Sequence, residues 1–323
     1  MLPPRCGAWA QSCVIRPPPP PCPSRSAGEI LYQNAANPST PAAAQFYEDG
    51  ITCSGDKSPN CKADATSHRF LDTFENVYTA PSLQVPWFFN AGNHDWHAVA
   101  NTSAELAYAQ QKNRKTTRWN FPYYYYNKID TFHDAAGAAV TVELVMIDTV
   151  ILCGLTAPHA KGAPGGQPTP HNDSTPIPPA ATHLAWLQKT LAASTADVLI
   201  VGGHYPVWSI AEHGSTDCLV KEVQPLLVKY KAALYVSGHD HNLQWTDDGT
   251  GVGYFHSGAG HESDSSNAHA SSVPQGASKF FAAPATGGFA SLVVASKASM
   301  DLAYYDGTGK VLYEVKAWPN PRA

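Results

Sequence analysis

The spacing of hydrophobic and polar positions predicts helices and strands that alternate through the middle of the chain. Apolar residues repeat with a helical period in four segments, and short apolar runs rich in β-branched and aromatic residues favour strands elsewhere. The predicted helices are residues 68–78, 104–112, 182–193 and 219–231. The predicted strands are residues 84–89, 140–147, 197–201, 233–236, 251–256, 289–295, 300–305 and 310–316. This order predicts a layered α/β fold with a mixed or antiparallel C-terminal part.

The N-terminal segment has a different texture. Residues 1–45 hold 10 of the 27 prolines and show no amphipathic period long enough for an element. We therefore expect residues 1–45 to be disordered or loosely attached, and residues 46–323 to form one domain. Within that domain, residues 157–180 are rich in Pro and Gly and predict an exposed loop.

The composition is that of a globular, enzyme-sized chain. The 323 residues are 43% hydrophobic and 15% charged, with a formal net charge of -5. No stretch reaches the roughly 18 consecutive apolar residues of a membrane span, and an acidic balance gives no general attraction to nucleic acid. A membrane span and a nucleic-acid partner are therefore disfavoured.

Cysteines and sequons bear on the cellular compartment. The seven cysteines form no CxxC pair, which favours structural disulfides over a zinc ribbon or a redox site. Two glycosylation sequons, at Asn101 and Asn172, fit an oxidising secretory compartment. The N-terminus lacks the apolar core of a signal peptide. Either the protein stays inside the cell or this start is not the native one.

Three predicted strands end in the same way, with an apolar run that leads to Gly and then to His or Asn. They lead to Asn93 and His94, to His204, and to His239 with His241. Strand ends in an α/β sheet gather ligands, because rigid strands aim the side chains and glycine allows a sharp backbone turn. A lone histidine is more often structural, but several imidazoles and an amide at one edge indicate a metal site.

The spacing of His239 and His241 bears on the number of ions. Side chains two positions apart in extended chain point the same way, so these imidazoles favour two adjacent ions over one. The chain has neither HExxH nor GxSxG, which disfavours a metalloprotease or a serine hydrolase. Paired ions suit phosphate-ester hydrolysis, because they polarise the phosphoryl oxygens and lower the pKa of a bridging water.

Three motifs, in this order, carry a resemblance to a known family. GNHD at residues 92–95, GGHYPVWSIAEHG at residues 202–214 and GHDHNLQ at residues 238–244 resemble the calcineurin-like metallophosphoesterases, specifically the tartrate-resistant purple acid phosphatases. The resemblance extends over about residues 46–315. It implies a four-layer αββα sandwich of two mixed β-sheets flanked by helices. It also implies hydrolysis of phosphate monoesters at acidic pH by a metal-bound hydroxide.

The resemblance implies a centre of iron(III) paired with a divalent iron, zinc or manganese ion. Asn93, His204 and His239 match the family's ligands of the divalent ion. Tyr47 and His241 match its ligands of the ferric ion. The family's substrates are small phosphomonoesters or phosphoproteins, its members are secreted or lysosomal or vacuolar, and we favour a monomer.

The remaining matched positions lie around the metal centre and on the surface. His94 and His213 resemble the substrate-pocket histidines that bind phosphate and protonate the departing alkoxide, although a purely supporting role for His213 stays open. Cys153 and Cys218 match a family disulfide, and Asn101 matches a glycosylated position.

Two aspartates of the family's metal centre are missing from this chain. One belongs to a GDWG-type motif on the first strand, and the other, in GDNFY, bridges the two ions. Ala44 stands at the bridging position, so the first strand region is expected to be absent or replaced. Loss of both carboxylates leaves the charge of a ferric and a divalent ion poorly offset. Binding of only one divalent ion, by Asn93, His204 and His239, is therefore the alternative to a two-ion centre.

Three interpretations stay open. In the first, residues 1–45 are a wrong start or a mis-spliced stretch of an active acid phosphatase. In the second, the chain is a phosphatase-like protein with impaired catalysis and at most one metal site. In the third, it is a phosphodiesterase or phosphoprotein phosphatase of the wider superfamily, against which the AEHG segment at residues 211–214 argues.

Overall fold

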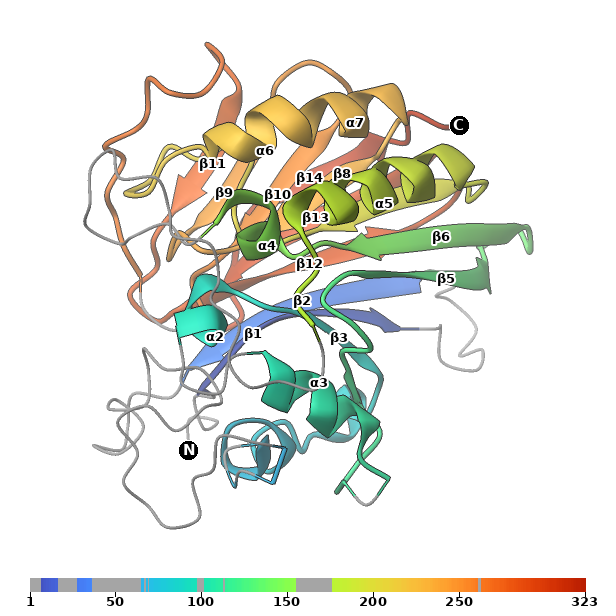
Figure 1. Ribbon diagram of the computed structural model, residues 1–323. Helices are drawn as coiled ribbons and strands as arrows, with labels where there is room; N and C mark the ends of the chain where they lie inside the picture. The colour runs from blue at the N-terminus through green and yellow to red at the C-terminus, as the bar shows by residue number, and fades with distance from the viewer. Residues whose placement is uncertain are drawn as a thin grey trace.

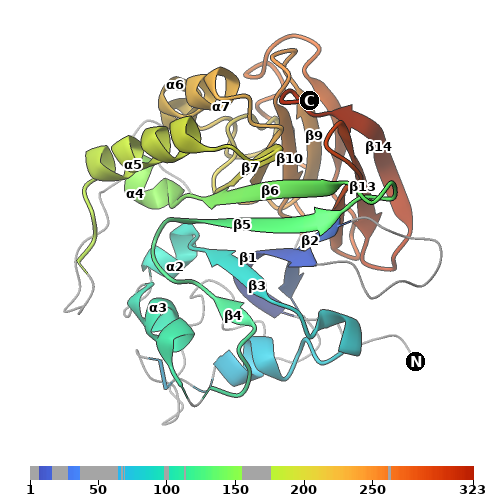
Figure 2. The same cartoon turned by 90° about the vertical axis from the view of Figure 1, so that its right-hand side faces the viewer.

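Within the described residues, two β-sheets of seven strands each lie face to face, with helices on both outer faces (Figure 1, Figure 2). This computed structural model therefore has the expected four-layer αββα arrangement. Strands β1 and β2 are described by their backbone alone. The structure describes residues 7–16, 28–36, 65–66, 68, 70–97, 102–112, 114–154, 176–260 and 263–323.

The second sheet carries four of the eight strands that the sequence predicts, and the first sheet carries the other four. The order of the second sheet is β11-β9-β10-β8-β7-β6-β5, in which β6, β7, β8 and β10 run parallel and the outer strands antiparallel. The parallel strand β7 is buried along its whole length, as expected for a strand covered on both faces. The bounds are β5 (Tyr126–His133), β6 (Ala139–Met146), β7 (Val198–Gly202), β8 (Leu234–Ser237), β9 (Leu243–Asp247), β10 (Gly253–Ser257) and β11 (Ser278–Ala282).

The first sheet joins the N-terminal and C-terminal parts of the chain. Its order is β14-β13-β12-β2-β1-β3-β4, and only β3 and β4 are parallel neighbours. It is therefore also a mixed sheet. The bounds are β1 (Gly7–Arg16), β2 (Gly28–Ala36), β3 (Trp87–Asn90), β4 (Trp119–Asn120), β12 (Gly288–Val294), β13 (Ser299–Asp306) and β14 (Val311–Pro319).

Helices cover the outer face of each sheet. Figure 2 shows α4 to α7 beside the second sheet, and α2 and α3 beside the first. The predicted helix at residues 219–231 is two helices, because Pro225 has no N–H to continue the hydrogen-bond ladder. The bounds are η1 (Leu71–Glu75), η2 (Pro81–Leu83), α2 (Asn93–His97), α3 (Ser103–Gln110), α4 (Thr149–Cys153), α5 (Ala180–Ala193), α6 (Asp217–Glu222) and α7 (Gln224–Lys229).

Aromatic side chains tie the two sheets together. The Tyr304 hydroxyl of β13 donates a hydrogen bond to the Gln244 carbonyl of β9 over 2.5 Å, and the Tyr304 ring packs 4.9 Å from that of Phe255 on β10. At the other end, the Tyr126 hydroxyl of β5 donates to the Phe89 carbonyl of β3 over 2.7 Å. These hydroxyls are satisfied inside an apolar layer, so burying them carries little penalty.

Strands β1 and β2 occupy a segment in which we expected no regular element. β1 pairs with β3, with Gln11 opposite Asn90, and β2 pairs with β12, with Tyr32 opposite Ala290. The apolar runs within β1 and β2 are too short to show a period. Without these two strands, however, β3 and β12 would present unpaired backbone groups. Pairing with these edges outweighs the weak local signal. The first strand region is thus filled by β1 and β2.

Two further expectations concern loops and membranes. The predicted loop at residues 157–180 lies mostly outside the described residues, and α5 begins at its end. Within the described part of the chain, no helix has both the length and the apolar character needed to cross a membrane.

Candidate active site

The site is assembled where three strands end. β3 leads through Gly92 to Asn93, the first residue of α2. The parallel neighbours β7 and β8 lead to His204 and His239. Because β3 belongs to the first sheet and the other two strands to the second, the site lies across the end of the sandwich.

The three side chains converge on one another. Nε2 of His204 lies 2.6 Å from Oδ1 of Asn93 and 3.1 Å from Nδ1 of His239. Asn93 and His239 are both buried, and the backbone of His239 has a left-handed φ of 80°. A left-handed non-glycine residue is strained, and such strain concentrates at functional sites.

Gly92 makes room for the His204 ring. A Cβ atom at position 92 would lie 2.8 Å from both Nδ1 and Cε1 of His204. The backbone N–H of Gly92 donates to Oδ2 of Asp95 over 2.7 Å, which fixes the turn that precedes Asn93. The glycine is therefore required by close approach of the imidazole rather than by an unusual φ.

Three carboxyl groups are buried behind this turn. They are Asp95 on α2, Glu105 on α3 and Asp148, which caps the N-terminus of α4. Burial raises the pKa of Asp95 and of Asp148 to about 7, although hydrogen bonds from backbone N–H groups oppose the shift. Burial and the charge of Asp95 also raise the pKa of Glu105.

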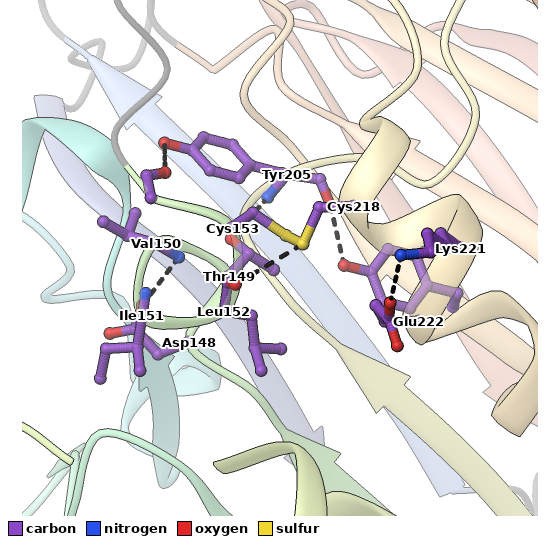
Figure 3. Close-up of a disulfide and its surroundings, with 12 residues drawn as sticks. Asp148, Thr149, Val150, Ile151, Leu152, Cys153, Tyr205, Cys218, Lys221 and Glu222 are labelled. Atoms are coloured by element: carbon purple, nitrogen blue, oxygen red, sulfur yellow. Dashed lines mark hydrogen bonds and ion pairs between the residues drawn. A yellow bond between two sulfur atoms is a disulfide. The ribbon is translucent and has the colours of Figure 1, made fainter. Parts of the chain in front are cut away.

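The His204 segment is held by α4 and a disulfide (Figure 3). The backbone N–H of Tyr205 donates to Oγ1 of Thr149 over 3.0 Å, and the Tyr205 hydroxyl donates to the Gly154 carbonyl over 3.3 Å. Cys153 at the end of α4 is bonded to Cys218 on α6. This is the pairing that the resemblance implied, and it joins α6 to α4, to which the hydrogen bonds of Tyr205 hold the His204 segment.

A histidine–aspartate pair lies beside the convergent set. His213 Nδ1 lies 2.7 Å from Oδ1 of Asp240, and the His213 backbone N–H donates to the same oxygen over 3.0 Å. The Ser209 hydroxyl donates to Oδ2 of Asp240. The His213 ring is centred 4.4 Å from the ring of His239, and its side chain is 27% exposed. His213 is thus oriented by a buried carboxylate and still open on one side.

The His213 and Asp240 pair shifts both pKa values. Burial of His213 opposes its charged form, but the hydrogen bond and negative charge of Asp240 outweigh burial and raise the pKa of His213. Burial likewise opposes ionisation of Asp240, yet its hydrogen bond with His213 and the charge of His256 lower the pKa of Asp240. Mildly acidic solution therefore favours an imidazolium paired with a carboxylate.

The convergent set fits one divalent cation by its chemistry. Imidazole nitrogens and an amide oxygen are donors that zinc, manganese and divalent iron accept. Over the residues that the structure describes, no three His, Cys, Asp or Glu side chains are grouped so that they could hold an ion. The set of Asn93, His204 and His239 has two imidazoles and no carboxylate, so it offers no negative charge to a ferric ion.

The other predicted site residues are placed less fully. His241 is partly buried after β8, and its carbonyl accepts a hydrogen bond from the Asp264 N–H over 2.8 Å. The backbone of His94 lies in α2, but its side chain is outside the description. Tyr47 and Asn101 also lie outside the described residues, as does Ala44.

Comparison with known proteins bears on the chemistry of this site. A family model described as Calcineurin-like phosphoesterase matches residues 33–243, which include Asn93, His204, His213 and His239. The chain belongs to the calcineurin-like phosphoesterase family. Tartrate-resistant acid phosphatase type 5 of rabbit (Oryctolagus cuniculus) is 40% identical over 91% of this chain and 82% of its own. The human (Homo sapiens) protein of that name is 42% identical over 78% of this chain and 74% of its own. These similarities support a phosphatase function for this purple acid phosphatase-like protein.

Solved structures share the fold. GAP50, the anchor in the inner membrane complex of Plasmodium, matches with a TM-score of 0.63 at 21% identity, over 79% of this chain and 73% of its own. A purple acid phosphatase from yellow lupin (Lupinus luteus) matches with a TM-score of 0.51 at 17% identity, over 79% of this chain and 44% of its own. Both confirm the predicted fold class.

Sequence reasoning missed the partner of His213. Asp240 stands between two predicted ligands in GHDH, but nothing local links it to a histidine 27 positions earlier, and the link depends on β7 and β8 being neighbours. The available signal was one acidic residue, Asp240, flanked by His239 and His241 at the end of a predicted strand.

Proposed function

We propose that this chain hydrolyses phosphate monoesters in mildly acidic solution. The observation that carries the proposal is the hydrogen bond of 2.7 Å between His213 and Asp240, beside the donor set of Asn93, His204 and His239. This arrangement combines a proton donor with a cation-binding set. The 40% identity to an acid phosphatase supports the same chemistry.

The cation-binding residues follow from the donor set and from the resemblance. Asn93, His204 and His239 would hold a divalent ion, and Tyr47 with His241 is proposed to hold a ferric ion. Bound metal supplies positive charge opposite the phosphoryl oxygens and makes water more acidic. Gly92 and the buried Asp95 hold the turn in the shape that brings Asn93 to His204.

His213 is proposed as the general acid. In the imidazolium form, Nδ1–H donates to Asp240 and Nε2 carries the proton available to substrate. Water oxygen forms a bond to phosphorus as the bond from phosphorus to the ester oxygen breaks, and His213 gives its Nε2 proton to the departing alkoxide. The proton from the water restores the imidazolium, so the products are an alcohol and inorganic phosphate. His94 is proposed to bind the phosphoryl group.

The second candidate is a phosphatase-like protein with impaired turnover. The observation that favours it is the absence of a carboxylate from the convergent set of described residues, because neutral ligands hold a highly charged centre less tightly. In this case the chain would bind one divalent ion and phosphate with little hydrolysis.

The proposal concerning compartment rests on the disulfide. The bond between Cys153 and Cys218 is typical of proteins that fold in an oxidising compartment. We propose that the chain is secreted or lysosomal and that Asn101 carries a glycan. Mass spectrometry of the protein from a secretory host, with and without a glycosidase, tests the glycan directly.

Hydrolysis of p-nitrophenyl phosphate at about pH 5 tests the proposed function. We expect the wild-type chain to turn over this monoester and the His204→Ala variant to lose more than about 100-fold in kcat/KM. His133→Ala, an exposed change on β5, is the matched control and should retain full activity. Absence of turnover with retained phosphate binding would favour the impaired protein, and faster hydrolysis of bis(p-nitrophenyl) phosphate would favour a phosphodiesterase.

A further inference from the structure

A loop between β10 and β11 packs on the segment that carries His213. The described part of this loop comprises residues 258–260 and 263–277. Residues 263–277 begin beside the turn after β8, where the Asp264 N–H donates to the His241 carbonyl over 2.8 Å. They then reach the segment of residues 209–214 that follows β7. The loop therefore contacts the segments that follow β7 and β8, two of the three strands that supply the candidate site.

His269 makes the contact to the His213 segment at two points. Its backbone N–H donates to the Ile210 carbonyl over 3.0 Å, and its side-chain Nδ1 lies 2.7 Å from the Ala211 carbonyl oxygen. A carbonyl oxygen only accepts, so Nδ1 of His269 carries the hydrogen. The segment before His213 is thus fixed by a pair of hydrogen bonds from one residue.

The ring of His269 also packs on the residue after His213. Gly214 has a left-handed φ of 73°, and a Cβ there would lie 2.8 Å from Cγ of His269. Glycine is therefore required at position 214 for two reasons: the left-handed backbone conformation and the close approach of the His269 ring. Position 213 is held between Ala211, which is hydrogen-bonded to His269, and Gly214, which touches its ring.

Ser272 secures His269 itself. Its backbone N–H and its hydroxyl both donate to the His269 carbonyl, over 2.8 Å and 2.7 Å. The same hydroxyl lies 3.4 Å from the Ser209 carbonyl oxygen. The loop therefore holds His269 rigidly enough to transmit its position to the neighbouring segment.

We propose that His269 is a positioning residue for the proton donor His213. Its hydrogen bond to Ala211 and its ring contact with Gly214 hold the His213 backbone where Nδ1 meets Asp240 and Nε2 meets the departing oxygen. The inference rests on the proposed function, because His213 must first be the general acid. His269 contributes no proton of its own to the reaction.

The test compares two substitutions that differ in one donor group. His269→Leu removes the Nδ1–H and keeps bulk, whereas His269→Asn supplies a side-chain N–H near the same place. Asn267→Ala, an exposed change in the same loop, is the matched control. For an alkyl phosphate, whose alkoxide needs a proton, we expect His269→Leu to lower kcat by about 10- to 100-fold. For p-nitrophenyl phosphate, whose leaving group is stable without a proton, His269→Leu should lower kcat by less than about threefold.

Rescue and spectroscopy decide the proposal. We expect His269→Asn to recover the alkyl phosphate kcat to within about threefold of wild type. Equal losses on both substrates, or no rescue by His269→Asn in a variant that folds, would overturn the positioning role. The Nδ1–H signal of His213 in a ¹H–¹⁵N spectrum, assigned with His213→Asn, should shift in His269→Leu and return in His269→Asn. If the wild-type chain lacks turnover but the signal shifts in His269→Leu and returns in His269→Asn, the proposed function fails and the effect of His269 on His213 stands. If the signal does not move in His269→Leu, the inference itself is overturned.

Discussion

At the scale of single residues, Gly92 decides whether His204 has room beside Asn93. The Gly92→Ala variant places a methyl group 2.8 Å from two atoms of the imidazole, so we expect the ring to move and its contact with Asn93 to break. Affinity for Zn²⁺, measured by isothermal titration calorimetry, should fall by at least about tenfold while the melting temperature changes little. Unchanged Zn²⁺ affinity in a folded variant would show that His204 is not part of the cation site.

His183 is a second residue with a testable energetic consequence. Its ring is fully buried on α5, is stacked 4.0 Å from the Tyr125 ring, and neither ring nitrogen has a hydrogen-bond partner. Burial lowers the pKa of His183 to about 3. The unfolded chain then binds a proton near pH 6.5 that the folded chain does not, so His183 costs stability as the pH falls below that value.

The size of this effect follows from linkage. Between pH 7 and pH 5 the wild-type chain should lose about 2 kcal/mol through His183 alone. Other groups titrate as well, including Asp95 and Asp148, whose raised pKa values act in the opposite direction. Urea unfolding of His183→Leu and of wild type at both pH values isolates the histidine, because the difference between them cancels the other groups. If both proteins change equally, His183 is protonated or solvated in the folded state.

At the scale of elements, the disulfide between α4 and α6 closes a loop with a sequence separation of 65 residues. Cross-linking a loop of this length restricts the unfolded chain and contributes about 4 kcal/mol. The paired Cys153→Ser and Cys218→Ser substitutions should lower the free energy of unfolding by about that amount in urea titration. A decrease below about 1 kcal/mol would mean that the hydrogen bonds of Thr149 and Tyr205 hold α4 without the cross-link.

The elements that could be predicted from sequence are the strongly apolar ones. β7 and β8 are buried along their whole length, β6 and β12 are mostly buried, and the predicted ranges fall within one or two residues of theirs. β5 was missed because its exposed and half-buried positions are polar except for Ile129, and its pairing with β6 supplies what the pattern lacks. Pairing outside the local sequence also explains why β1 and β2 were not expected.

The sequence predicted those residues of the candidate site that belong to local motifs, but not the contacts between positions far apart in the chain. The strand ends brought Asn93, His204 and His239 together as expected, because glycine and histidine follow a buried strand in each motif. The contacts of Asp240 with His213 and of His269 with Ala211 join positions 27 and 58 apart, which no local spacing encodes. Such contacts are fixed by the tertiary arrangement of the loops.

At the scale of the whole molecule, both sheets contribute to one site. β3 of the first sheet supplies Asn93, and β7 and β8 of the second supply His204 and His239. The hydroxyls of Tyr126 and Tyr304 fix one sheet against the other by bonding across the layer between them. The relative position of the sheets therefore sets the distance between the donor atoms, and packing of the sandwich is a condition for the proposed cation binding.

The most direct measurement of this account is bound metal per chain, determined by elemental analysis on the samples used for turnover. We expect wild type to retain at least one divalent ion per chain, and His204→Ala and His239→Ala to lose both the ion and the hydrolysis of p-nitrophenyl phosphate together. His133→Ala should keep both. Hydrolysis by a chain that holds no metal, or full metal retention in both ligand variants, would contradict the assignment of Asn93, His204 and His239 as the cation site of a phosphatase.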